Sequence, residues 1–295
     1  MTQKHLLSDE WYQSLAEMIA LIGNNDFSQY FAQLCQSLTG YDSTVLIAFL
    51  KYQKPSLIFS NLSSKDETPT LGPYFDGAFL LDPFYDLYRN KAADGIYRLS
   101  DVAPEVFSET EYYRSYFKNT RIIDESAMMV KITEEICLSA SFGLRDGSKP
   151  RELQLRELRK VFPILASTFR QHWSRENQLA PLLDKGTTNG QFGTTLEAAF
   201  SNFGSLYLTK RECEIVKLIL KGYSSKSIAS LLEISVDTVK VHRKRFHNKL
   251  DISSQAELFS LFLEAISMVP LGAELDPLHY YYSSQEIVDK NLTRP

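Results

Sequence analysis

The stretch Leu208–Leu250 reads LTKRECEIVKLILKGYSSKSIASLLEISVDTVKVHRKRFHNKL, and its pattern predicts three short helices. Thr209 followed three residues later by Glu212 is a capping box, which marks the start of the first helix. Gly222 follows the last turn of that helix and can adopt the left-handed conformation that ends it. Serines stand where the next two helices should begin: Ser224 or Ser225, and then Ser235.

Each of these helices has an apolar side that can bury itself against the other two. The residues expected to be buried in the first two helices are Ile215, Val216, Leu218, Ile219, Ile228, Ala229, Leu231 and Leu232. Those of the third helix are Val236, Val239, Phe246 and Leu250. Three amphipathic helices with such short connections predict a small all-helical bundle.

The third helix also carries a basic face. Lys240, Lys244 and Asn248 lie four residues apart on this face, with Val241 beside them. The cations that flank it are Arg243, Arg245 and Lys249. Long side chains on an outward helix face can reach base edges in a DNA major groove, while flanking cations contact phosphates. The alternative is a basic helix that is merely solvated, which the agreement of caps, spacing and charge disfavours.

The same residues carry the motifs of a known family. Leu-Thr-x-Arg-Glu-x-Glu stands at Leu208–Glu214, Gly-x-Ser-x-Lys-x-Ile-Ala at Gly222–Ala229, and Ile-Ser-x-x-Thr-Val-Lys-x-His at Ile234–His242. The family's Lys-Leu follows at Lys249–Leu250. Residues 206–267 therefore resemble the LuxR-type helix-turn-helix domain, which is also found in NarL- and GerE-type regulators.

The resemblance implies roles for individual residues. Lys240, Val241 and Lys244 would meet base edges. Three others would lie near the DNA backbone: Lys226, Thr238 and His242. A fourth helix, Ser254–Met268, would offer apolar side chains for dimer contact, namely Leu258, Leu261, Phe262 and Ile266. The chain departs from the family pattern at Ser227, where Glu is usual, and at Gln255, where Arg is common.

Length and charge predict two domains with different partners. The chain has 295 residues, which is more than one domain usually needs. Residues 209–267 carry ten Lys and Arg against seven Asp and Glu, whereas the whole chain carries 32 against 36. A mildly basic module beside an acidic one indicates that only the basic module contacts nucleic acid. The expected boundaries are a ligand-sensing and dimerisation domain at 1–178, a linker at 179–193, a DNA-binding domain at 194–268 and a tail at 269–295.

Several other classes of protein find no support in the sequence. No apolar run approaches the ~20 residues of a membrane span, and the N-terminus lacks a secretory signal, so we expect a cytoplasmic protein with no membrane partner. The cysteines Cys35, Cys137 and Cys213 are far apart, which favours reduced thiols. His242 and His247 are poorly spaced for a metal. With no nucleophile elbow, Walker loop or Rossmann fingerprint, we expect neither an enzyme nor a cofactor.

The first domain is predicted to mix helices and strands. Helical spacing covers Asp9–Ile22 and Asp26–Leu38, and a long helix covers Pro150–Gln178. The expected strands are Ser43–Lys51, Pro55–Leu62, Ile96–Leu99, Ala127–Thr133 and Ile136–Leu144. This order resembles a GAF- or PAS-like sensor. The predicted fold is thus an α+β sensor, with an antiparallel sheet flanked by helices, joined to an all-α four-helix LuxR-type helix-turn-helix domain.

Three kinds of control are plausible for such a regulator. A phosphoreceiver would need acidic residues at the end of its first strand, but Val45–Leu50 is followed by Lys51-Tyr52. Receptors for acyl-homoserine lactones usually place tryptophans in the pocket, and here Trp11 and Trp173 lie near the ends of the domain. The Asp82-Pro83 pair resembles those receptors only weakly. Another small-molecule effector remains the favoured control.

The effector pocket is predicted in the aromatic segment Pro73–Phe117 and the acids near it. The candidate ligand-binding residues are Phe79, Asp82, Phe84, Tyr85, Tyr88, Tyr97, Tyr113, Asp124 and Glu125. Aromatic rings with carboxylates would suit an amine or quaternary cation, whereas Arg121 could instead recognise a carboxylate. The same rings could simply pack in the core.

Together these features predict a ligand-responsive transcriptional regulator that binds double-stranded DNA. Its expected form is a homodimer on an inverted-repeat operator. The alternative is a ligand-independent regulator whose N-terminal domain only dimerises.

Overall fold

The computed structural model describes residues 8–51, 53–104, 107–110, 112–145, 152–175, 195, 197–270 and 272–292. The chain forms two compact units. The first comprises Met1–Leu71, Pro83–Val102 and Thr120–Asn189, and the second comprises Gly72–Asp82, Ala103–Asn119 and Gly190–Pro295. Two segments of the predicted first domain thus fall in the second unit. The linker predicted at 179–193 lies outside the described residues.

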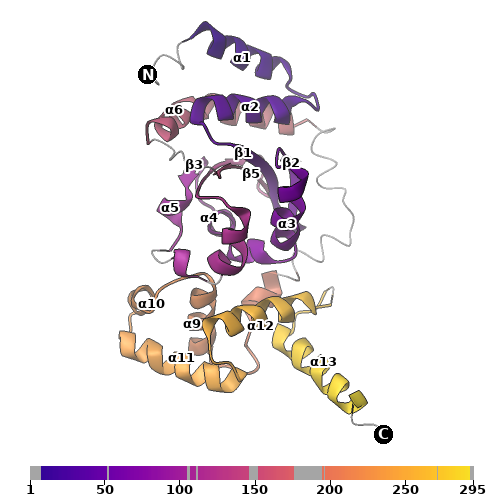
Figure 1. Ribbon diagram of the computed structural model, residues 1–295, viewed down its shortest axis with the longest axis vertical. Coiled ribbons are helices and arrows are strands. Elements are labelled where there is room, and N and C mark those ends of the chain that lie inside the picture. The colour runs from indigo at the N-terminus through magenta and orange to yellow at the C-terminus, as the bar shows by residue number, and fades with distance from the viewer. Residues whose placement is uncertain are drawn as a thin grey trace. The chain divides into compact units, whose positions relative to one another are not determined.

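The N-terminal half alternates helices and strands (Figure 1). Its helices are α1 (Asp9–Ala20), α2 (Phe27–Thr39), α3 (Ser64–Phe75), α4 (Pro83–Arg89), α5 (Leu99–Val102) and α6 (Glu152–Trp173). Its strands are β1 (Ser43–Leu50), β2 (Gln53–Ser60), β3 (Gly95–Arg98), β4 (Asp124–Lys131) and β5 (Ile136–Leu144). Short helical turns are η2 (Ala78–Leu81), η3 (Phe107–Glu109), η4 (Tyr112–Tyr116) and η5 (Phe117–Thr120). Every strand expected from the sequence is present.

The C-terminal half is helical. Its helices are α9 (Lys210–Leu220), α10 (Ser225–Leu231), α11 (Val236–Leu250), α12 (Gln255–Ser267) and α13 (Pro277–Leu292). The predicted fold class, an α+β domain followed by an all-α domain, is confirmed. Helix α13 lies in the tail, for which the sequence analysis assigned no structure.

The strands form one antiparallel sheet in the order β2-β1-β5-β4-β3. Strands β1 and β5 pair without interruption, from Ser43 opposite Gly143 to Leu50 opposite Ile136. Strands β4 and β5 form a hairpin in which Lys131 pairs with Cys137. The central strand β5 is thus paired with a neighbour on each side, which makes it a firm base for side chains that project from either face.

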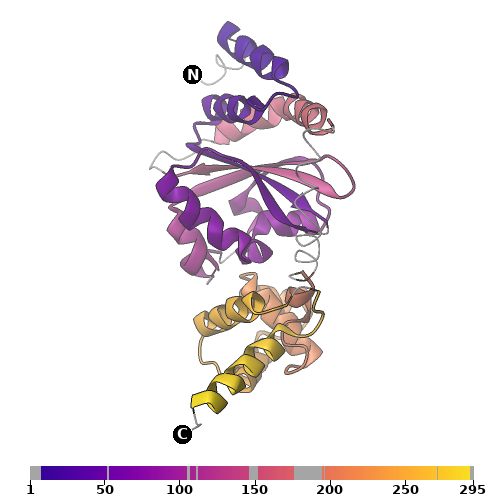
Figure 2. The same ribbon diagram turned by 90° about the vertical axis from the view of Figure 1, so that its right-hand side faces the viewer.

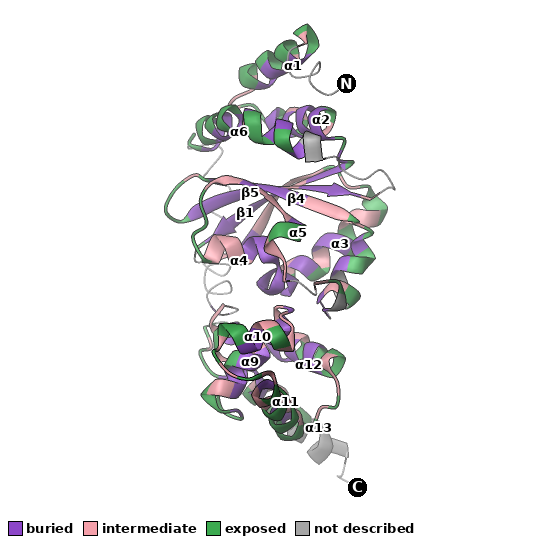
Figure 3. Ribbon diagram, turned by 90° about the vertical axis from the view of Figure 1, so that its left-hand side faces the viewer, coloured by how far each residue is buried: buried purple, intermediate pink, exposed green. Residues whose placement is uncertain are grey.

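Helices cover both faces of the sheet (Figures 2 and 3). Successive residues of a strand point to opposite faces, so Leu138 and Ala140 of β5 join the main core with residues of α1, α2 and α6. Cys137 and Ser139 point to the other face, over which α3, α4 and α5 lie. Helix α4, which carries Phe84, Tyr85 and Tyr88 of the aromatic segment, thus lies on this second face.

A buried histidine fixes the turn between α1 and α2 to α6. The backbone N–H of Gly23 donates to Nδ1 of His172 over 2.9 Å, and the His172 ring stacks on Phe27 with centroids 4.1 Å apart. Burial, and then the charge of Arg175, lower the pKa of His172 to about 4. The ring is therefore neutral near pH 7, which leaves Nδ1 able to accept the hydrogen bond.

The core of the C-terminal half extends on both sides of the helix-turn-helix segment. Phe262 of α12 is fully buried, and its ring contacts those of Phe200 and Phe203 at centroid distances of 5.6 and 5.4 Å. Leu258, Leu261 and Ile266 are buried as well. The prediction that these four α12 side chains are offered for dimer contact is therefore wrong. Flanking residues of the same chain already cover that face.

The segment after α12 is tied down by a buried carboxylate. Asp276 is 1% exposed and accepts backbone hydrogen bonds from Gly204 and Leu206, both at 2.9 Å, and from Leu278 at 3.0 Å. Beyond it, Tyr282 of α13 packs on Tyr207 with centroids 5.2 Å apart. The segment from Asp276 to Tyr282 is thus packed against the C-terminal core.

Candidate nucleic-acid interface and effector pocket

The ends of α9, α10 and α11 are fixed by the residues that the sequence analysis selected. The Thr209 hydroxyl accepts from the Glu212 N–H over 3.3 Å, and the Glu212 carboxylate accepts from the Thr209 N–H over 2.8 Å. Ser224 and Ser235 cap α10 and α11 by accepting from the N–H groups of Ser227 and Thr238, each over 3.0 Å. Gly222 adopts φ 92°. The predicted capping box, serine caps and glycine turn are confirmed.

Helix α11 has one buried and one exposed face. Val239, Phe246 and Leu250 are buried, whereas Val236 is only half-buried. The outward face exposes Lys240, Val241, Lys244, Arg245 and Asn248. Val241 is 49% exposed and is the aliphatic side chain of this otherwise polar face.

Leu218, Leu232 and Val236 were predicted to be buried and are half-buried, and one further apolar residue is exposed. Leu231 is 56% exposed, although the sequence pattern placed it inside. Ile228 takes the inward position, and Leu232 four residues later is half-buried. Leu231 is the last residue of α10 and its side chain faces solvent.

The cations around α11 are not equivalent. Arg243 is half-buried and donates from Nη1 to the Ser225 hydroxyl over 3.2 Å, and burial lowers the pKa of its guanidinium. Lys249 donates to the buried Glu212 carboxylate over 2.7 Å. Lys240 pairs with the exposed Asp237 over 3.0 Å. Lys244 and Arg245 are exposed, with no hydrogen bond or ion pair to the part of the chain that the structure describes.

The residues predicted near the DNA backbone surround that face. Lys226 is exposed on the first turn of α10. Thr238 shares a 2.8 Å hydrogen bond with the Ser235 hydroxyl on the first turn of α11. His242 is half-buried, and its Nδ1 has no hydrogen-bond partner among the described residues. Lys226 and Thr238 thus lie on the first turns of their helices, and His242 lies in the middle of α11.

The aromatic residues of the predicted effector pocket are mostly core residues. Phe79, Phe84 and Tyr85 are each at most 2% exposed. The Tyr85 ring contacts Phe49 of β1 and Tyr88 of α4 at centroid distances of 5.2 and 5.7 Å. Burial of this kind matches the alternative interpretation, in which the rings pack α4 onto the sheet. Tyr88 alone of this group lines a pocket described below.

Two further tyrosines of the predicted pocket make other contacts. The Tyr97 hydroxyl donates to the carbonyl of Ala93 over 2.5 Å. Tyr113 belongs to the second unit, where its ring packs with Phe107 and Phe117, both at 5.6 Å. Each of these two tyrosines therefore has contacts within its own unit.

The predicted acidic anchors are already engaged. Asp82 is buried and accepts from the Tyr74 hydroxyl over 2.7 Å. Asp124 accepts two hydrogen bonds from Arg98, both at 3.2 Å. Glu125 follows Asp124 on β4 and so points to the opposite face of the sheet. The carboxylate cage expected for a cationic effector is therefore not present around the described aromatic residues.

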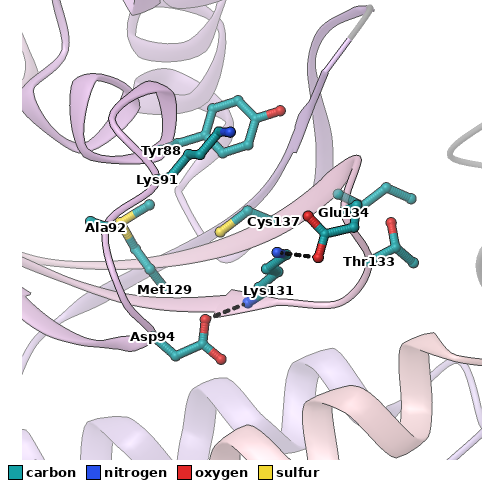
Figure 4. A pocket seen from close by; sticks show the side chains of 10 residues that line it. Tyr88, Lys91, Ala92, Asp94, Met129, Lys131, Thr133, Glu134 and Cys137 are labelled. Atoms are coloured by element: carbon teal, nitrogen blue, oxygen red, sulfur yellow. Dashed lines mark hydrogen bonds and ion pairs between the residues drawn. The ribbon is translucent and has the colours of Figure 1, made fainter.

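A pocket lies instead between α4 and the β4–β5 hairpin (Figure 4). Its inner cavity has a volume of about 110 Å³ and is lined by Tyr88, Lys91, Ala92, Asp94, Met129, Lys131, Thr133, Glu134, Ile136 and Cys137. It shares most of its rim with a wider, more open basin of about 480 Å³ that reaches Arg170 of α6. In Figure 4, Tyr88 and Lys91 lie on the helix side, and Met129 and Cys137 rise from the strands.

The thiol in this pocket is chemically quiet. Burial, and then the nearby charge of Asp94, raise the pKa of Cys137 to about 12. The thiol is therefore protonated at neutral pH and is not a nucleophile. It serves the pocket as a small apolar surface.

Comparison with known proteins gives this geometry a context. Residues 206–262, which contain α9, α10 and α11, match the GerE family model, described as bacterial regulatory proteins of the luxR family. An HTH-type transcriptional regulator encoded in the exeN 3′ region of Aeromonas salmonicida is 31% identical over 195 residues, covering 65% of this chain and 97% of that protein. The chain belongs to the luxR family of transcriptional regulators.

Other relatives share only one half of this luxR-family regulator. The oxygen regulatory protein NreC of Staphylococcus haemolyticus is 47% identical over 57 residues, which cover 19% of this chain and 26% of NreC. The crystal structure of the VqsR LBD domain of Pseudomonas aeruginosa has a TM-score of 0.51 and 24% identity, and covers 57% of this chain and 97% of that one. That likeness shows the fold of the regulator's N-terminal half.

The pocket of this luxR-family regulator includes residues that the sequence analysis did not select. Met129, Lys131 and Cys137 are alternate positions of ordinary strands, and Lys91 lies in the turn after α4. The period of two in β5 was visible, but nothing in the sequence indicated which strand face lies open beneath α4.

Within the described residues, no helix is long and apolar enough to cross a membrane, and no group of three His, Cys, Asp or Glu side chains could hold a metal.

Proposed function

We propose that this luxR-family regulator binds an inverted-repeat operator as a homodimer and that a small-molecule effector held by its first unit controls the binding. The observation that carries the proposal is the outward face of α11. Its cations and Val241 are exposed, while Val239, Phe246 and Leu250 lock the opposite face into the bundle. A rigid helix with exposed cations is what entry into a major groove requires.

The individual DNA contacts divide by exposure and pairing. Lys240, Val241 and Lys244 are exposed on the outward face and would read base edges. Arg245 and Lys226 would contact phosphates, and so would Thr238 and His242. Arg243 and Lys249 are held by Ser225 and Glu212, so they would act mainly by fixing α11 in place.

The dimer contact lies elsewhere than on the apolar face of α12, since Phe262 and its neighbours are buried in one chain. We place it in the N-terminal half, which the sequence analysis assigned to sensing and dimerisation. The fold shared with the VqsR LBD domain supports effector binding by the same half, because LBD denotes a ligand-binding domain.

Selection from random-sequence DNA duplexes with the full chain tests the operator. The expected sequences contain two inverted half-sites whose centres lie about one helical turn apart, with two chains bound to each duplex. A single half-site, or one chain per duplex, would contradict the homodimer. Effector candidates can be chosen as compounds that raise the melting temperature of the full chain. If the regulator is ligand-independent, none of these compounds should change its affinity for the operator.

A further inference from the structure

We propose that the pocket between α4 and the β4–β5 hairpin binds a small monoanionic amphiphile, such as an aromatic or short-chain carboxylate. This inference rests on the proposed function and names the chemical class of the effector. The pocket lies entirely within the first unit.

The inner cavity selects for a small apolar group. Its volume of about 110 Å³ is somewhat below the ~150 Å³ of a cavity that holds benzene, so it can enclose a short chain or part of a ring. Its floor is formed by Met129 and Cys137, and Tyr88 covers it from α4. A thioether, a protonated thiol and an aromatic ring give such a group an apolar and polarisable surface.

The rim carries an excess of positive charge. Arg170 pairs with Asp94, and Lys131 pairs with Glu134 over 2.6 Å. These two pairs leave Lys91, whose ammonium makes no hydrogen bond or ion pair with the described part of the chain. The pKa of Glu134 is lowered mainly by the hydrogen bond from Lys131. The positive charges of Lys91 and Lys51 lower it further. The unpaired ammonium of Lys91 beside an apolar cavity is complementary to a ligand that has one negative charge and an apolar group.

The backbone at Lys91 supports a role beyond the turn itself. Lys91 adopts φ 54°, in the left-handed region that favours Gly and Asn. A long cation at such a position costs backbone energy without helping to form the turn. The same conformation brings Lys91 to the lining of the cavity, next to Tyr88 (Figure 4).

The strand face that carries Cys137 also carries a buried hydroxyl without a hydrogen-bond partner among the described residues. Ser139 follows Cys137 by two residues on β5, so both side chains point toward α4. Ser139 is 1% exposed, and its hydroxyl has no hydrogen-bond partner among the described residues. Buried hydroxyls are usually paired. Ser139 is not one of the residues that line the pocket, so the effector class rests on Lys91 and the apolar lining and not on this hydroxyl.

The experiment measures binding of matched probes to the full chain by calorimetry and thermal shift. Benzoate and hexanoate should bind and raise the melting temperature. Their neutral counterparts, benzyl alcohol and hexanol, and their cationic counterparts, benzylamine and hexylamine, should bind at least about tenfold more weakly because they lack the negative charge that Lys91 would recognise.

Two variants locate the charge. Lys91→Asn removes the ammonium while Asn tolerates the left-handed backbone, and it should weaken benzoate binding about tenfold. Lys65→Gln removes an exposed lysine of α3 that does not line the pocket, and should leave binding unchanged.

The outcomes separate this inference from the function on which it rests. If the alcohols or amines bind as well as the acids, if Lys91→Asn binds benzoate like the parent chain, or if no probe binds, the anionic class is wrong. If benzoate binds through Lys91 but selected operator DNA is bound equally well with and without it, the pocket assignment stands and control of DNA binding by this effector fails.

Discussion

Lys249 Nζ lies 2.7 Å from Glu212 Oε2 and so joins the end of α11 to the first turn of α9. Glu212 is 2% exposed, and the same carboxylate oxygen accepts from the Thr209 N–H. One side chain therefore caps the first helix of the DNA-binding bundle and anchors the last turn of the recognition helix. The sequence pattern reveals the cap but assigns Lys249 only to DNA.

Glu212→Gln should lower the free energy of unfolding of the C-terminal half by about 1–3 kcal/mol, because it weakens a charged hydrogen bond at a buried site. Glu214→Gln is the matched control, since Glu214 pairs with Arg211 at the surface and should matter by less than about 1 kcal/mol. Urea denaturation of both variants gives the comparison. Equal losses would show that the link to α11 adds nothing to an ordinary surface pair.

Lys244→Ala should cost about 1–3 kcal/mol of operator affinity and relax the preference for one base pair, because Lys244 is exposed on the groove face. Arg245→Ala should instead weaken all duplexes alike and reduce the dependence of affinity on salt. Fluorescence anisotropy with the operator and with single-base variants, at several salt concentrations, distinguishes the two effects. Full operator affinity in both variants would refute the assignment of α11 as the recognition helix.

Phe262→Ala should destabilise the C-terminal half by about 3–5 kcal/mol, because it empties a site enclosed by Phe200 and Phe203. Thermal and urea unfolding should report this loss, while sedimentation at low temperature should show the same oligomeric state as the parent chain. Dissociation of a dimer with no loss of stability would restore α12 as a dimer helix.

Ser139→Ala should leave the chain equally stable or up to about 1–3 kcal/mol more stable, because it removes a buried hydroxyl that lacks a partner among the described residues. Ser126→Ala is the matched control on β4, since the Ser126 hydroxyl is buried and shares a 2.8 Å hydrogen bond with Tyr41. That variant should be less stable by about 1 kcal/mol. A loss at Ser139 as large as that at Ser126 would mean that its hydroxyl is paired.

Acid should weaken the first unit through His172. Its pKa falls from an ordinary 6.5 to about 4 on folding, so the unfolded chain binds the proton more readily. The contribution of the neutral ring is complete above pH 6.5 and is lost as the pH falls toward 4, by at most about 3 kcal/mol. Denaturation of the parent chain and of His172→Gln at pH 7.5 and 4.5 should show a smaller acid loss in the variant.

Interactions within a few residues were visible in the sequence. Thr209 with Glu212 and Ser235 with Thr238 are three residues apart, so residue type and spacing alone determine them. Strand β5 was found with its bounds from its period of two. Local chemistry therefore predicted the bundle and the sheet.

Interactions between distant segments were not visible. Asp276 binds the N–H of Gly204 across 72 positions, and Phe200 covers Phe262, so the closed face of α12 could not be inferred from its own apolar stripe. Tyr85 and Tyr88 are both aromatic and three residues apart, yet one is buried and the other lines a pocket. Which ring meets open space depends on how α4 packs on the sheet.

The buried carboxylate of Asp276 sets where an autonomous DNA-binding fragment has to stop. A piece with the bounds of the family match, 206–262, would lose Asp276 and leave the N–H of Leu206 without its acceptor, and it would also lose the Phe200 and Phe203 rings that pack on Phe262. A fragment made to express this half alone should begin before Phe200 and extend through α13. In this protein the region that matches the family is therefore shorter than the fragment that we expect to fold independently.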